Sequence, residues 1–147
     1  EDHHAIVRFI EAAIRDCQPD VLITHHPADV HVDHGITSEC CMEASKLPMR
    51  QIANIQPIRK IMYMEVPSST DWNVSTANGV FVPNVFVGVS DEDLAEKVKA
   101  VGVYKDVIRK APHPRSREVI NAMAVLRGSQ SGLMAAESFQ LVFGLGV

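Results

Sequence analysis

The sequence lacks the features that mark membrane, secreted and nucleic-acid-binding proteins. No apolar run approaches the roughly 18 residues that cross a bilayer, and no signal peptide precedes the first helical pattern. The three cysteines, Cys17, Cys40 and Cys41, form no CxxC pair and no even set, which argues against a disulfide framework. Basic residues are not clustered and the net charge is −4, so nucleic acid is not a predicted partner. We predict a cytoplasmic protein with core cysteines in a reducing compartment.

The length and the hydrophobic content of the chain are sufficient for one compact domain. Of the 147 residues, 46% are hydrophobic and 22% are charged, which allows a sizeable core and argues against disorder. We therefore expect a single domain over residues 1–147. The chain opens at Glu1 without a methionine, and we expect it to be a fragment or a processed product of a longer protein.

Helical and strand-like patterns alternate along the chain. Apolar residues recur at helical spacing over 5–17, and 21–24 is a short β-branched run typical of a buried parallel strand. The remaining expected elements are a helix over about 34–46, a strand over 58–66, a turn at Asn78-Gly79, one or two strands within 80–89, a helix from Ser90 to about 108, a helix from Ser116, a loop over 128–132 and an apolar stretch over 133–143. The alternation predicts an α/β fold with a Rossmann-like, mostly parallel sheet flanked by helices.

Four of the seven histidines lie within residues 25–34. They follow the predicted strand over 21–24, and open α/β sheets bind ligands beyond the carboxyl ends of their strands. His31 and His34 are three residues apart, so both rings reach one pocket if a helix begins at His34. Asp29 or Asp33 is placed to cap that helix. The local pattern leaves two interpretations open, a metal or acid–base site and a polar loop whose histidines contact water, since HExxH and CxxC patterns are absent.

The stretch PADVHVDH at residues 27–34 resembles the second motif of the PIG-L deacetylases, also called LmbE-like proteins. Members of that family are zinc-dependent N-deacetylases that act on N-acetylglucosamine-type sugar conjugates. Further segments resemble the family in the order that the family has them: Pro19-Asp20-Val21 leading into Thr24, Phe81-Val82-Pro83, Lys97 with Tyr104, His113-Pro114-Arg115-Ser116 (common in bacterial members), and Gly132 with Ala136-Glu137-Ser138-Phe139.

The resemblance implies unequal roles for the residues of this stretch. His34 would be a Zn²⁺ ligand. His31 would stabilise the oxyanion or protonate the leaving amine, and Asp33 would orient His31. Asp29 would brace the loop. The substrate would be an N-acetylated sugar conjugate, whose identity the sequence does not fix.

The family's first motif, His-Pro-Asp-Asp-Glu, is absent from this chain. The two His-Pro pairs, His26-Pro27 and His113-Pro114, are not followed by acidic residues; His26 and His113 are themselves candidates for contact with the sugar. The chain thus resembles the carboxyl-terminal portion of such a domain, with its amino-terminal strands and two zinc ligands on a missing segment or chain. We expect the isolated 147 residues to be inactive. The alternative is a degenerate, non-catalytic sugar-binding homologue, and a homo-oligomer remains open.

Overall fold

The structure is a computed structural model that describes residues 2–50, 54–74 and 79–146. The predicted turn at Asn78-Gly79 includes a residue outside this described part. Within it, no helix combines the length and the apolar character needed to cross a bilayer. The elements, in chain order, are α1 (His3–Cys17), β1 (Val21–His25), α2 (Val32–Ala44), the 3₁₀ turn η1 (Leu47–Arg50), β2 (Lys60–Met64), the 3₁₀ turn η2 (Thr70–Trp72), β3 (Val85–Gly88), α3 (Asp91–Gly102), α4 (Arg117–Ser131) and β4 (Ala136–Gly144).

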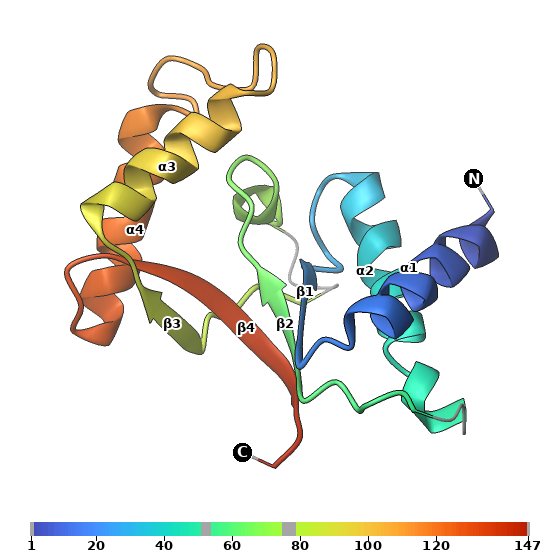
Figure 1. The fold of residues 1–147 in the computed structure, drawn as a ribbon. Helices are drawn as coiled ribbons and strands as arrows, with labels where there is room; N and C mark the ends of the chain where they lie inside the picture. Colours follow the sequence, from blue (N-terminus) through green and yellow to red (C-terminus); the bar gives the residue numbers. More distant parts are fainter. Residues whose placement is uncertain (1, 51–53, 75–78, 147) are drawn as a thin grey trace.

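The described strands form one four-stranded mixed sheet in the order β1-β2-β4-β3 (Figure 1). Strands β1 and β2 are parallel, with Val21 opposite Lys60, whereas β4 runs antiparallel to both β2 and β3. The predicted α/β fold is confirmed, but the prediction of a mostly parallel sheet is wrong. The cause is β4, which the apolar stretch over 133–143 forms and which inserts between β2 and β3.

Side-chain caps set where the later helices begin. At α3, the Ser90 hydroxyl accepts a hydrogen bond from the Asp93 N–H while the Asp93 carboxylate accepts one from the Ser90 N–H, a complete capping box. Helix α3 ends at Gly102, six residues earlier than predicted. At α4, Ser116 caps the Val119 N–H, and the helix continues through the predicted loop to Gly132, which has φ 76°.

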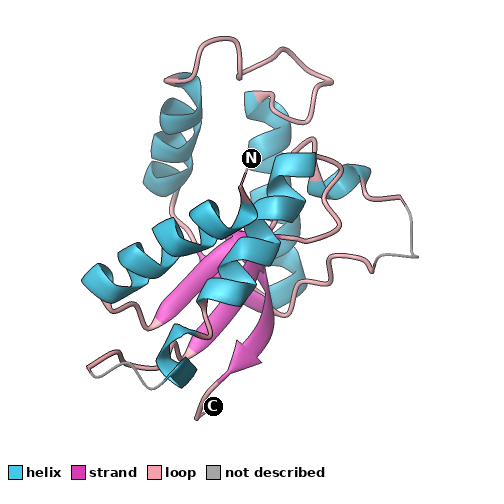
Figure 2. Cartoon of the chain, turned by 90° about the vertical axis from the view of Figure 1, so that its right-hand side faces the viewer, coloured by secondary structure: helices cyan, strands magenta, loops and turns pink. Residues whose placement is uncertain are grey.

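Two separate hydrophobic cores hold the helices to the sheet. The first lies beneath α1 and α2 and is formed by Val7, Ile14, Cys40, Ala44, Leu47, Ile58 and Ile61. The second is smaller and joins α3, α4 and the start of β4 through Leu94, Ala124 and Ala135. Figure 1 shows the two helix pairs at opposite ends of the sheet, and Figure 2 shows α1 and α2 in front of its strands.

Strand β1 is an edge of the described sheet, and this edge is apolar. Val21 and Ile23 are 41% and 44% exposed, although β-branched residues of a parallel strand are normally covered. Val30 and Val32, in the loop and helix that follow, are exposed too. Exposed apolar edges of this kind are usually covered by another strand or segment.

Candidate active site

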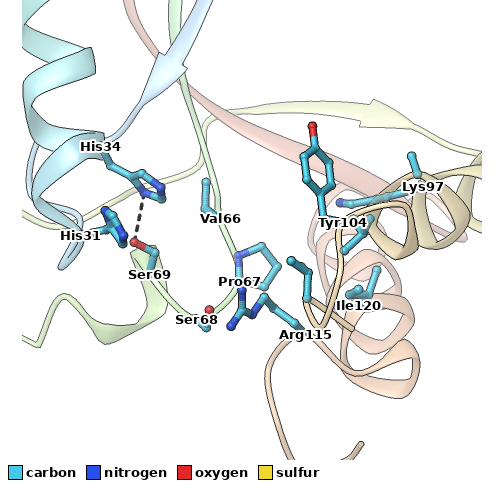
Figure 3. A pocket seen from close by; sticks show the side chains of 13 residues that line it. His31, His34, Val66, Pro67, Ser68, Ser69, Lys97, Tyr104, Arg115 and Ile120 are labelled. Carbon is cyan, nitrogen blue, oxygen red and sulfur yellow. Dashed lines mark hydrogen bonds between the residues drawn. The ribbon is translucent and has the colours of Figure 1, made fainter. Parts of the chain in front are cut away.

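The histidine loop faces a cleft of about 670 Å³. One wall carries His31 and His34 at the start of α2, the floor is the segment 66–69 that follows β2, and the opposite wall is formed by α3, by Arg115 and by Ile120 of α4 (Figure 3). Because β1 and β2 are parallel, their carboxyl ends meet at this place. The structure therefore locates the histidines where α/β sheets bind ligands.

His34 is held by a buried carboxylate. Its Nδ1 lies 2.9 Å from Oδ2 of Asp29 and 3.1 Å from Oγ of Ser69. The Asp29 side chain is completely buried, while that of His34 is 21% exposed. An ionised carboxylate only accepts hydrogen bonds, so Nδ1 must carry the ring hydrogen and donate it. This arrangement leaves the Nε2 lone pair of His34 available for a ligand, as in metal-bound histidines that are supported by a carboxylate.

The predicted cap by Asp29 or Asp33 is wrong. The N-cap residue of α2 is His31, and it makes no side-chain capping hydrogen bond. Asp33 lies in the first helical turn, where its charge complements the helix dipole. Asp29 is drawn away from the helix end because its carboxylate bonds to His34 instead.

Three imidazoles stack in this loop. The ring of His34 lies between those of His25 and His31, with centroid distances of 4.0 Å and 4.9 Å. Burial, helped by the neighbouring His34, lowers the pKa of His25 from its usual value of 6.5, although Asp29 acts in the opposite direction. The stack therefore favours a neutral His25 beside His34. The Nδ1 of His25 is buried and has no hydrogen-bond partner within the described residues.

His31 is more open than His34. Its side chain is 59% exposed, and its Nδ1 lies 3.8 Å from Oδ2 of Asp33, which is itself 82% exposed. That separation is longer than a hydrogen bond, so the two groups interact only by charge in this structure. The role of Asp33 in orienting His31 stays a prediction.

The two candidate sugar contacts both lie away from the cleft lining. His26 is 3% exposed, and its Nδ1 accepts a hydrogen bond from the Ala28 N–H. The Nδ1 of His113 accepts a hydrogen bond from the Arg115 N–H. Each ring thus braces the backbone of its own loop, and burial lowers the pKa of His26.

A zinc ion needs about three protein ligands. Among the described residues, no group of three His, Cys, Asp or Glu side chains converges to hold a metal ion. His34 fits the chemistry of one ligand, because a carboxylate orients its ring and leaves Nε2 free to coordinate. The described residues alone do not fit a complete zinc site.

The wall opposite the histidines is basic and apolar. Lys97 of α3 binds the Glu137 carboxylate of β4. Just behind the cleft, Arg127 binds Glu65 through two nitrogens, and the Ser138 hydroxyl donates to the same carboxylate. Arg115 reaches the cleft lining from the loop before α4. In the sequence, Arg115 is noted only as part of the segment His113-Pro114-Arg115-Ser116, and nothing in the sequence places it in the cleft.

Comparison with known proteins shows the fold. No protein-family model and no curated protein sequence matches the chain. Among solved structures, the chain superimposes with a TM-score of 0.68 and 18% identity on the 4-carboxy-2-hydroxymuconate hydratase GalB of Pseudomonas putida, and with 0.70 and 19% on the conserved protein TT1542 of Thermus thermophilus. The score is 0.65 at 16% identity for an N,N'-diacetylchitobiose deacetylase of Pyrococcus horikoshii.

These matches cover nearly the whole chain but not the whole of the other structures. They span 100%, 97% and 95% of this chain, and 61%, 60% and 52% of the hydratase, the Thermus protein and the deacetylase respectively. The chain thus corresponds to a little over half of each solved structure. The resemblance to PIG-L deacetylases that the sequence motifs indicate is thereby confirmed at the level of the fold.

Proposed function

We propose that this chain is the carboxyl-terminal portion of a zinc-dependent hydrolase that removes the N-acetyl group from an N-acetylglucosamine-type sugar conjugate. The observation that carries the proposal is the His34–Asp29 pair at the carboxyl end of β1. Histidines that bind metal ions usually donate their other ring N–H to a carboxylate, which fixes the tautomer and the orientation of the ring. The buried Asp29 carboxylate does this for the partly exposed His34. The fold shared with a chitobiose deacetylase supports the same reaction class, although fold alone does not establish an activity.

In the proposed reaction, water adds to the acetamide carbonyl carbon, the carbon–nitrogen bond breaks, and acetate and a free amine leave. Zn²⁺ would supply an activated water and polarise the carbonyl. His31 is the residue of this chain that is placed to move a proton. Its exposed imidazole stands at the mouth of the cleft, next to His34, and would protonate the leaving amine nitrogen.

We further propose that the remaining zinc ligands, and the general base, come from a segment outside these 147 residues. Three buried polar atoms near the end of β1 have no partner within the described residues: Oγ1 of Thr24, Nδ1 of His25 and Oδ1 of Asp29. Buried polar groups are almost always satisfied, so a further segment packing against this strand end would provide their partners. The apolar edge of β1 is where it would pair. On this proposal, the 147 residues are inactive by themselves.

The test is an assay of acetate release from N-acetylglucosamine conjugates by the complete gene product. His31→Ala should retain zinc and lose turnover by about 10²- to 10⁴-fold. The matched control is His4→Ala, at an exposed position of α1, which should keep full activity. If zinc is absent and no acetate is released while the sugar still binds, the degenerate binding homologue is the correct interpretation. If His31→Ala keeps full turnover, the proposed role of His31 is refuted.

A further inference from the structure

The cleft contains two permanent cations, Lys97 and Arg115, in a protein whose net charge is −4. No aspartate or glutamate is among its described lining residues, but Glu137 pairs with Lys97 and Asp29 pairs with His34 just behind the lining. Within the described residues, Arg115 is therefore the permanent cation of the cleft without an acidic partner. A cation of this kind attracts an anionic group of a ligand.

The two permanent cations of the cleft are not equivalent. Lys97 is neutralised by Glu137, as described above. Arg115 forms no ion pair within the described part of the chain, and its Nε is buried without a hydrogen-bond partner there. Arg127, the other part-buried arginine of the described residues, is paired with Glu65. A guanidinium with an unused buried N–H needs an acceptor.

The backbone that carries Arg115 is fixed on both sides. The Arg115 N–H donates to Nδ1 of His113 at 3.0 Å, and the Arg115 carbonyl accepts from the Arg109 N–H at 3.3 Å. Ser116, the next residue, is fully buried and caps α4. In Figure 3 the guanidinium lies below Pro67 and beside Ser68, next to the cleft floor and across from the labelled histidines. The side chain is therefore presented from a rigid loop rather than from a mobile one.

Apolar side chains surround the site of this cation. Val66, Pro67, Val101, Val107 and Ile120 line the same cleft, and apolar walls strengthen a charge-assisted hydrogen bond because they exclude water. An arginine fork matches the two oxygens of a carboxylate or phosphate. We propose that Arg115 binds an oxyanion group of the substrate, so that the substrate is an acidic N-acetyl sugar conjugate rather than a neutral one. The inference rests on the proposed function for the acetamide part of that substrate.

The experiment compares three probes that share the acetamide and the sugar ring, using the complete gene product. They are N-acetylglucosamine, its 3-O-lactyl ether N-acetylmuramic acid, which adds a carboxylate, and N-acetylglucosamine 6-phosphate. Binding is measured by calorimetry and acetate release by coupled assay. We expect at least one anionic probe to bind about tenfold or more tighter than the neutral sugar. The probe that gains identifies the anion as carboxylate or phosphate.

Variants of Arg115 test whether this residue causes the tighter binding of the anionic probe. Arg115→Gln should abolish the preference for the anionic probe, and Arg115→Lys should retain part of that preference. Arg117→Gln removes the same charge two residues away, from an exposed position outside the cleft, and should keep the preference. Equal affinity for all three probes, or a preference that survives Arg115→Gln, overturns the inference. Acetate release without anion preference would reject this inference alone, and anion preference without acetate release would reject only the proposed function.

Discussion

Nδ1 of His34 lies 2.9 Å from a carboxylate oxygen of Asp29, whose side chain is completely buried. Asp29 is five residues before His34 and belongs to the turn that follows β1, so the pair joins the strand end to the first turn of α2. The ring of His34 is thereby fixed in one tautomer and one orientation before any ligand arrives. Such pre-organisation is what a metal-binding or catalytic side chain requires.

The first prediction concerns this pair. Asp29→Asn keeps the shape of the side chain but removes the charge that orients His34, so we expect zinc affinity of the complete gene product to fall about 10- to 100-fold. Zinc titration against a competing chelator measures it. Asp33→Asn is the matched control, because that carboxylate is exposed and 3.8 Å from His31, and it should change zinc affinity little. Equal zinc affinity of Asp29→Asn and the unaltered protein would contradict the assigned role.

The second prediction concerns the ion pair behind the cleft. Arg127 and Glu65 are 16% and 13% exposed and are joined by two hydrogen bonds. Arg127→Ala leaves the Glu65 carboxylate buried without its partner, which should lower the free energy of unfolding by about 3 kcal/mol. Lys99→Ala removes an exposed partner of Glu96 and should cost no more than about 0.5 kcal/mol. Urea denaturation measures the free energy of unfolding of both variants. Similar decreases for the two variants would show that the buried pair contributes no more to stability than the exposed pair.

The third prediction concerns Gly128 of α4. A methyl group there would lie 2.7 Å from backbone atoms of Ala135 and Leu133, so α4 would have to move away from the turn that leads into β4. We expect Gly128→Ala to destabilise the fold by about 1–3 kcal/mol despite the better helix propensity of alanine. Gly102→Ala meets only Ile108 at 3.9 Å and should be neutral or stabilising. Thermal denaturation that ranks the two variants in the opposite order would refute this packing argument.

The fourth prediction concerns pH. Burial lowers the pKa of His26 below 6.5, and the ring accepts a hydrogen bond at Nδ1 only while it is neutral there. The unfolded chain therefore binds more protons between the two pKa values, so stability is complete above about pH 6.5 and declines as the pH falls. His26→Asn retains an acceptor at the same place and cannot titrate. Its free energy of unfolding should fall less steeply below pH 6.5, and an unchanged slope would argue against His26 as a source of the acid sensitivity.

Local sequence patterns were sufficient for several elements of this fold. The helical spacing over 5–17, the β-branched run after Pro19 and the Ser90 capping box depend only on neighbours in the chain, and the structure has α1, β1 and the start of α3 where these patterns predict them. Strand β4 could not be oriented in the same way. Its antiparallel insertion between β2 and β3 depends on contacts between residues far apart in the chain, such as Met64 with Phe139.

The same distinction applies to the candidate site: features that depend on neighbouring residues could be predicted, and contacts between distant segments could not. The histidines and their place after β1 could be read from the sequence, because loop and strand are adjacent. The Asp29–His34 hydrogen bond depends on how the loop turns. The family resemblance instead implied that Asp33 orients His31 and that Asp29 braces the loop. Arg115 faces the histidines only because the sheet brings the loop before α4 opposite the start of α2. The sequence of either segment alone does not indicate that the two segments face each other.

The central claim is that His34 is one ligand of a zinc site whose other ligands lie outside these 147 residues. Metal analysis of the complete gene product, with and without His34→Ala, tests it most directly, with circular dichroism to verify that the variant remains folded. The account predicts one zinc per chain in the unaltered protein and none in folded His34→Ala. Full zinc occupancy in His34→Ala, or a complete gene product that binds no zinc, would contradict it.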